Sequence, residues 1–219
     1  MTGALPSRRA ALGAALALAA SSAWAKRSHK PRPKPRPAPL EPDDMAMGNP
    51  RAPVTVVEYA STGCPHCARW SNEVFPAFKA QFVDTGQVRF VLRECITGDP
   101  DLAASGFMLA RCAGPAKYFT VVENVFTHQD DIRQPGDAGA AVLKDIAISA
   151  GLSEAAYQAC LSDKDGFAAV QARSDRHANV DKVDSTPTFE INGKRMEGFA
   201  TLDALTAAIA VAAPPRRRT

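Results

Sequence analysis

A strand–helix–strand unit in the first half of the chain is the feature that most constrains the fold. Residues 54–59 (Val-Thr-Val-Val-Glu-Tyr) are apolar and β-branched, which is typical of a buried strand. A turn sequence at 61–63 follows, and Cys64-Pro65 then opens a helix with proline at its first position. A second strand is predicted at 88–92, and the right-handed crossover rule makes the two strands parallel.

The helix that starts at Pro65 is predicted to continue for several turns. Val74, Phe75, Phe78 and Phe82 recur at helical spacing, so we expect them to face the core and not to form a ligand site. Pro76 falls inside this pattern, and the ring of an interior proline clashes with the preceding turn. A kink is therefore predicted there.

The second half of the chain changes from a helical to a strand pattern. Five helices are predicted in a block at about 100–180, near 101–112, 115–127, 139–150, 153–161 and 165–179. Asn192-Gly193 between the strand-like runs 187–191 and 194–197 is a strong hairpin signal. A last helix is predicted at about 201–212, capped by Thr201. This order predicts an α/β, thioredoxin-like core, βαβ then ββα, interrupted by an all-helical insertion at about 100–180.

The first 25 residues resemble an export signal. Arg8 and Arg9 supply the positive charge, 10–20 is a short apolar stretch, and Ala23-Trp24-Ala25 is a small-x-small site that predicts cleavage after Ala25. The alternative is a buried helix of the mature domain, and the Sec and twin-arginine routes both stay open. Export predicts a periplasmic protein in a compartment where disulfides persist.

Two basic, proline-rich segments flank the predicted domain at 43–213. In residues 26–42, prolines alternate with Lys or Arg, which predicts a semi-rigid polyproline II linker. Residues 214–219 form a short basic tail. Because these segments hold much of the positive charge in a chain of net charge +3, the domain itself is acidic, which argues against nucleic acid as a partner. No apolar run reaches the roughly 18–20 residues of a spanning helix.

The Cys64-Pro65-His66-Cys67 sequence is the main chemical signal. A C-x-x-C motif directly after a strand and at the start of a helix favours a redox-active dithiol. Half of a zinc site is one alternative, but no second cysteine pair of comparable spacing completes four ligands, so we expect no metal. A purely structural disulfide is the other alternative, and it would more typically bridge a loop.

The start of a helix favours ionisation of Cys64. The first backbone N–H groups of a helix lack intrahelical partners, and the helix dipole adds partial positive charge. Both favour a thiolate, so the pKa of Cys64 should lie below that of an ordinary cysteine. His66, in the same turn, can add a hydrogen bond or a positive charge. A stabilised thiolate is a good leaving group, and this predicts a disulfide that is readily passed to substrates.

Position in the motif suggests separate roles for three residues. Cys64 is expected to be exposed and to form the mixed disulfide. Cys67, one turn further along the helix, is expected to be the buried resolving thiol, whose reaction needs a proton acceptor. Glu58, on the strand six residues before Cys64, can lie beneath the helix and serve as that acceptor. Its alternative is an exposed charge at a strand end.

These motifs together resemble the DsbA-like periplasmic thiol–disulfide oxidoreductases. The resemblance covers about 45–212 and depends on the Val-Glu-Tyr-Ala strand at 57–60, the Cys64–Cys67 motif, Thr186-Pro187 before a strand, and the helical block. It implies a cis Pro187 that faces the dithiol and, with Thr186, holds unfolded peptides in extended form. It also implies a DsbB-type membrane partner that reoxidises the dithiol, and no cofactor besides the Cys64–Cys67 disulfide.

Three further cysteines remain. In an oxidising compartment we expect Cys112 and Cys160 to pair and clamp the helical block, as in some relatives; the alternative is two buried thiols. Closing that loop would stabilise the fold by roughly 3–4 kcal/mol. Cys95, the odd cysteine, is expected to be a buried inert thiol.

The sequence thus favours an exported oxidase that donates its disulfide to reduced, unfolded exported proteins. A reductase or isomerase is the closest alternative, because Thr186 precedes Pro187 in isomerase-like members of the family too. A module that binds a soft metal ion through Cys64, His66 and Cys67, or a chaperone-like module, is the alternative from another class. We expect a monomer, since 26–42 is a linker and not a dimerisation domain.

Overall fold

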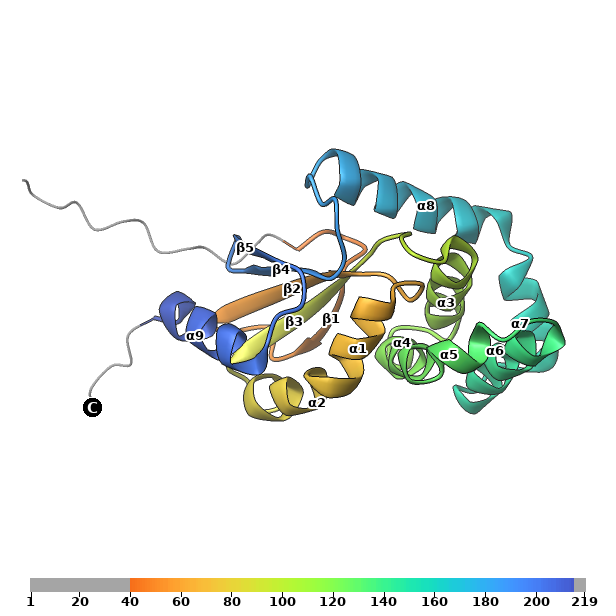
Figure 1. Cartoon of the computed structure of the whole chain (residues 1–219), viewed down its shortest axis with the longest axis horizontal. Coiled ribbons are helices and arrows are strands. Elements are labelled where there is room, and N and C mark those ends of the chain that lie inside the picture. The colour runs from red at the N-terminus through yellow and green to blue at the C-terminus, as the bar shows by residue number, and fades with distance from the viewer. Residues whose placement is uncertain (1–39, 215–219) are drawn as a thin grey trace, which may run out of the picture. The chain divides into compact units, whose positions relative to one another are not determined.

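The computed structural model describes residues 40–214 (Figure 1). The predicted export signal, residues 26–39 of the predicted linker and residues 215–219 of the tail lie outside the described residues. Within 40–214, the helices are too short or too polar to cross a bilayer.

A five-stranded mixed sheet, in the order β1-β3-β2-β4-β5, forms the centre of the fold. The predicted strand–helix–strand unit is present, and β2 and β3 are parallel, with Val54 opposite Val88 and Ala60 opposite Glu94. All other pairs are antiparallel. The strands are β1 (Met45–Gly48), β2 (Val54–Ala60), β3 (Val88–Glu94), β4 (Thr188–Ile191) and β5 (Lys194–Glu197).

The hairpin between β4 and β5 turns at Asn192-Gly193, as the sequence predicted. Both residues have positive φ, 47° and 80°, as a tight two-residue hairpin turn requires. The Asn192 side chain also fixes the turn to the sheet, since its Oδ1 accepts from the N–H of Thr55 at 2.8 Å.

The helix after Cys64 is interrupted where proline disturbs it. Helix α1 (Pro65–Glu73) ends at Val74, the short α2 (Phe75–Phe78) begins just before Pro76, and a π-helical segment, η1 (Lys79–Val83), completes the crossover. The predicted kink is thus a break between two helices. It keeps the buried Phe75 and Phe78 on the core side.

Six helices in the middle of the chain form the insertion. One of them, α5, was not predicted, because four residues carry too little periodicity to indicate a helix. The six are α3 (Pro100–Cys112), α4 (Tyr118–Thr127), α5 (Gln129–Ile132), α6 (Asp137–Ser149), α7 (Glu154–Leu161) and α8 (Lys164–Asn179). In Figure 1, α3–α7 lie beyond α1, and α8 runs back toward the sheet.

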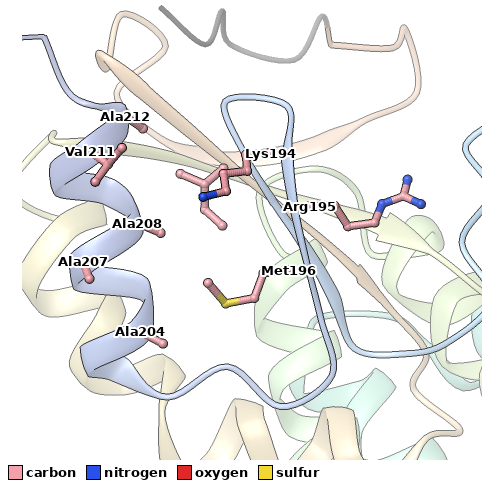
Figure 2. Close-up of a pocket in the computed structure, with 9 residues that line it drawn as sticks. Lys194, Arg195, Met196, Ala204, Ala207, Ala208, Val211 and Ala212 are labelled. Atoms are coloured by element: carbon pink, nitrogen blue, oxygen red, sulfur yellow. The ribbon is translucent and has the colours of Figure 1, made fainter.

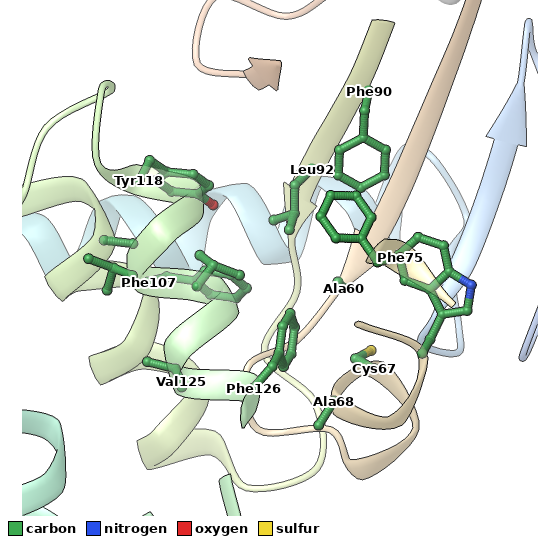
Figure 3. Packing of buried hydrophobic residues seen from close by; sticks show 14 of the residues in the cluster. Ala60, Cys67, Ala68, Phe75, Phe90, Leu92, Phe107, Tyr118, Val125 and Phe126 are labelled. Carbon is green, nitrogen blue, oxygen red and sulfur yellow. The ribbon is translucent and has the colours of Figure 1, made fainter. Parts of the chain in front are cut away.

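The two faces of the sheet have different cores. Val56, Phe90 and Phe189 point to the larger one, which α1, the insertion and the last helix, α9 (Leu202–Ala212), complete. Val57 and Tyr59, which alternate with Val56 and Glu58 along β2, point to a smaller cluster on the other face. Figure 3 shows the larger core where it reaches Cys67.

Helix α9 and the β4–β5 hairpin enclose a shallow apolar groove of about 290 Å³. Figure 2 shows small α9 side chains facing Met196 across it, whereas Arg195 points away from the helix. The helix begins at the predicted cap, where the Thr201 hydroxyl oxygen accepts from the N–H of Ala204 at 3.2 Å.

The ordered contacts of the domain begin before the predicted boundary at residue 43. Leu40 packs against the smaller core, and Glu41 forms an ion pair with Arg93 at 3.5 Å. Strand β1, which follows, was not predicted, because Met-Ala-Met-Gly is short and carries little strand propensity.

Candidate active site

Cys64 lies at the N-cap of α1, just beyond the carboxyl end of β2. Its backbone is extended (φ −96°, ψ 121°), and Pro65 occupies the first helical position. Cys67 is one turn further along, fully buried among apolar side chains that include Phe126 and Ala60 (Figure 3). Both cysteines are thiols in the structure.

The Cys64 thiolate is strongly stabilised, and the pKa of Cys64 is lowered to about 5. The largest cause is a hydrogen bond from the Cys67 thiol. The Thr186 side chain and the backbone N–H groups of Cys67 and His66 add to it, and together they outweigh the opposing effect of burial. His66 thus acts on Cys64 through its backbone, and its ring is exposed.

The expectation that Cys64 would be exposed was wrong, since only 6% of its surface is accessible. The loop before β4 causes this burial, because the carbonyl of Thr186 accepts a hydrogen bond from the Cys64 thiol at 3.4 Å. The Thr186–Pro187 peptide bond in that loop is cis. Thr97, after β3, holds the loop in place, with the two threonine hydroxyls 2.6 Å apart.

Glu58 lies inside the molecule, not at a solvent-exposed strand end. It is 2% exposed, and its neighbours in the sheet are Leu92 and Phe189. Among residues 40–214, its Oε1 finds no hydrogen-bond partner. Burial, followed by the negative charge of Cys64, raises the pKa of Glu58 well above its ordinary value.

The same surroundings act on Cys67. Burial first, then its hydrogen bond to Cys64 and the charge of Glu58, raise the pKa of Cys67 well above the ordinary value. The motif therefore holds two thiols of opposite character, one stabilised as an anion and one as a neutral thiol. Glu58 is the buried acid beside them: the charge of Cys64 raises its pKa, and its own charge raises the pKa of Cys67.

Sequence reasoning missed two residues of the insertion that contact this site. Gln129 donates from Nε2 to the carbonyls of Thr62 and Cys64, at 2.7 and 3.2 Å. Arg133, at the end of α5, donates from Nη2 to the carbonyl of Gly63 at 2.6 Å. No sequence signal marks them, since both are common polar residues 65 and 70 positions from their partners.

The remaining cysteines lie away from the dithiol. Cys112 and Cys160 form a disulfide with a Cα–Cα distance of 6.3 Å, which ties α3 to α7. Cys95 is a thiol that is 5% exposed, and burial is the main reason that its pKa is raised to about 12.

A cluster of potential metal ligands was not predicted either, because its members are distant in sequence. Glu41, His177 and Asp181 bring ligand atoms within 4.8 Å of one another. Arg93 lies 3.5 and 3.6 Å from the two carboxylates, and Arg176 also pairs with Glu41. These charges are therefore already compensated by cations within the protein.

Two thiols with opposite pKa shifts at a helix N-terminus, one of them bonded to a cis-proline loop beside a mixed sheet, are an arrangement typical of the thioredoxin fold. A sequence profile of the thioredoxin family matches residues 40–210, and the chain belongs to this family. Both the predicted fold class and the resemblance to DsbA-like proteins are confirmed.

Sequence matches to named proteins relate the chain to a narrower group within the thioredoxin family. The chain is 34% identical over 161 residues to a Rickettsia typhi protein named as a protein-disulfide oxidoreductase, matching 74% of this chain and 59% of that protein. It thus spans about three-fifths of the length of that relative. The disulfide bond formation protein D of Bacillus subtilis is 29% identical over 169 residues, or 72% of this chain and 71% of that one.

Solved structures agree with these sequence matches. The crystal structure of Wolbachia pipientis α-DsbA1 is similar with a TM-score of 0.71 and 27% identity, over 78% of this chain and 91% of that one. BdbD from Bacillus subtilis, at 24% identity, has a TM-score of 0.69 over 81% and 96% of the two chains and thus shares the fold.

Proposed function

We propose that this protein is an exported thiol–disulfide oxidoreductase that donates the Cys64–Cys67 disulfide to reduced, unfolded proteins. The observation that carries the proposal is the position of Cys64 at the N-cap of α1 and against the Thr186 carbonyl, where its pKa is lowered to about 5. A thiolate this stable favours the reduced enzyme, and each pKa unit corresponds to about 30 mV toward a more oxidising couple. Such a disulfide is readily transferred to a substrate by thiol–disulfide exchange.

Donation proceeds in two exchanges. A substrate thiolate attacks Sγ of Cys64, the Cys64–Cys67 bond breaks, and Cys67 leaves with the electron pair. Its raised pKa means that Cys67 takes up a proton. Glu58, also with a raised pKa, is the buried acid that supplies it, and Glu58 is the proton acceptor when the dithiol is reoxidised. A second substrate thiolate then attacks the substrate sulfur of the mixed disulfide. Cys64 leaves as a stable thiolate, so the substrate is oxidised by two electrons and the enzyme is reduced.

The Thr186-Pro187 loop is the proposed substrate-binding element. It contacts the Cys64 thiol and precedes β4, so an extended peptide laid along its backbone would bring a substrate sulfur to Cys64. Pro65 and His66, which lie between the two cysteines in the sequence, are exposed and would border that peptide.

The sequence features of residues 1–42 support a proposed cellular setting. We place the protein in the periplasm, as a monomer, after cleavage of the export signal at Ala25. A DsbB-type membrane protein would reoxidise the dithiol, and no cofactor besides the Cys64–Cys67 disulfide is required.

The equilibrium constant of the Cys64–Cys67 dithiol against glutathione tests the proposal. An oxidant should remain largely reduced in a glutathione buffer that oxidises an ordinary dithiol, and it should rapidly oxidise a reduced, unfolded protein. A strongly reducing potential would instead assign the site to a reductase. Efficient rescue of a scrambled protein would favour an isomerase, the direction that Thr186 before Pro187 leaves open. A stoichiometric thiol-dependent metal complex with little turnover would overturn the redox function altogether.

A further inference from the structure

We propose that Gln129 and Arg133 of the helical insertion are positioning residues for Cys64: by hydrogen-bonding the carbonyls beside it, they favour the reduced, ionised cysteine and make the disulfide more oxidising. The inference deepens the proposed function and rests on it for its biological meaning. We call this pair, with its contacts to residues 62–64, the carbonyl clamp.

The clamp is a connected set of hydrogen bonds. Gln129 Nε2 bonds the carbonyls of Thr62 and Cys64 at 2.7 and 3.2 Å, and Arg133 Nη2 bonds the carbonyl of Gly63 at 2.6 Å. Arg133 Nη1 also donates to Gln129 Oε1 at 2.7 Å, which fixes the amide in this orientation. Gln129 is only 3% exposed, so its bonds are shielded from water.

These contacts are not needed simply to attach the loop to the insertion. The Thr62 hydroxyl already donates to the carbonyls of Leu102 and Ala103 in α3, at 3.1 Å each. The carbonyl of Gly63 also accepts from the N–H of Asp99 at 3.0 Å. The backbone of residues 61–64 is thus anchored independently, and we infer that the clamp has an additional, electrostatic role.

That role follows from the charges near the reacting sulfur. Three successive carbonyl oxygens, each partially negative, lie within two residues of Cys64, where a full negative charge develops on reduction. Donors on these oxygens, one of them a guanidinium, offset their repulsion of the thiolate. The effect adds to the hydrogen bonds from Cys67 and Thr186 and opposes burial, which raises the pKa of Cys64.

The test compares Arg133→Met and Gln129→Met with Gln134→Ala. Gln134 is a matched control, because it is exposed and its side chain bonds only within its own turn, to the carbonyl of Asp130. Each variant is equilibrated with glutathione, and Cys64 is titrated by thiolate absorbance. We expect both Met variants to shift the equilibrium about 3–10-fold toward the disulfide, with a raised thiol midpoint, and Gln134→Ala to match wild type.

Arg133→Lys and Arg133→Gln separate charge from mere packing, and they serve if a Met variant fails to fold. Lys should recover most of the wild-type equilibrium constant and Gln only part of it. If Gln129→Met and the three Arg133 variants all keep the wild-type equilibrium constant and differ only in thermal unfolding, the clamp is purely structural and the inference is wrong. If wild type fails to oxidise unfolded proteins but the variants still shift the equilibrium, the clamp stands and the proposed function fails.

Discussion

Cys64 and Cys95 each follow the carboxyl end of one of the two parallel strands, on opposite faces of the sheet. Their exposed fractions are almost equal, 6% and 5%. The pKa of Cys64 is nevertheless lowered to about 5, and that of Cys95 is raised to about 12. Burial alone therefore says little about the reactivity of a cysteine in this molecule.

The difference lies in what surrounds each sulfur. Cys64 receives donors from a helix N-terminus, a second thiol and a threonine. Cys95 faces the charges of Asp181, Glu94 and Glu58, which add to the effect of burial. A thiolate needs nearby donors, and only the α1 side of the sheet supplies them.

The largest expected effect on the reaction comes from removing the sulfur of Cys64, with removal of the Cys95 sulfur as the comparison. Cys64→Ser should lower the rate of disulfide transfer to a reduced, unfolded protein by at least ~10³-fold, because no electrophilic sulfur remains for the first exchange. Cys95→Ser, equally buried, should leave the rate within about twofold of wild type. Loss of activity in the Cys95 variant, without loss of folding, would mean that the reactive sulfur has been misassigned.

A pH titration should distinguish the ionisation of Cys64 from that of Cys95 without mutation of the dithiol. In Cys95→Ser and wild type alike, one thiolate should appear with a midpoint near pH 5, because Cys64 ionises early. Since Cys67 keeps its proton, reduction takes up one proton above that midpoint and two below it. The potential should therefore change by roughly 30 mV per pH unit above pH 5 and roughly 60 below. A constant slope through pH 5 would contradict the low pKa.

Glu58 should affect the rate of the reaction at the dithiol. Glu58→Gln removes the buried proton donor and should slow disulfide transfer by about 10–100-fold. It should also lower the pKa of Cys95, because the charge of Glu58 contributes to raising it. Stopped-flow rates against pH measure the effect on disulfide transfer. An unchanged rate would mean that protons reach Cys67 by another route.

The Glu58 carboxyl should also lower the free energy of unfolding, by an amount that depends on pH. Its raised pKa means that the folded state prefers the protonated form, so wild type loses stability as pH rises above 4.5, the ordinary value. Glu58→Leu should therefore be more stable than wild type by about 1–3 kcal/mol at neutral pH, and by less near pH 4. Denaturant unfolding at the two pH values gives the comparison.

The sequence predicted the local elements of the fold and the site better than the contacts between distant residues. The strand at 54–59, the helix start at Cys64-Pro65 and the Asn192-Gly193 turn have local signatures, because each depends on a few adjacent residues. The carbonyl clamp and the burial of Cys64 arise from tertiary contacts of Gln129 and Thr186 with distant loop atoms, and no periodicity or motif reports such contacts. For the same reason, the ion pairs around Arg93 could not be predicted.

The smallest effect on the reaction is expected from the face opposite Cys64. Arg93 is 5% exposed, and it pairs with Asp44 at 3.0 Å and donates to the Tyr59 hydroxyl at 2.8 Å. Arg93→Met leaves these groups buried without their cation and should lower the free energy of unfolding by about 3–5 kcal/mol. The thiolate midpoint of Cys64 and the glutathione equilibrium should nevertheless stay at their wild-type values, because the lowered pKa of Cys64 comes from Cys67, Thr186 and the start of α1. If the folded variant instead shows a shifted Cys64 midpoint, the two faces are electrostatically coupled, and the contrast between Cys64 and Cys95 cannot be ascribed to local donors alone.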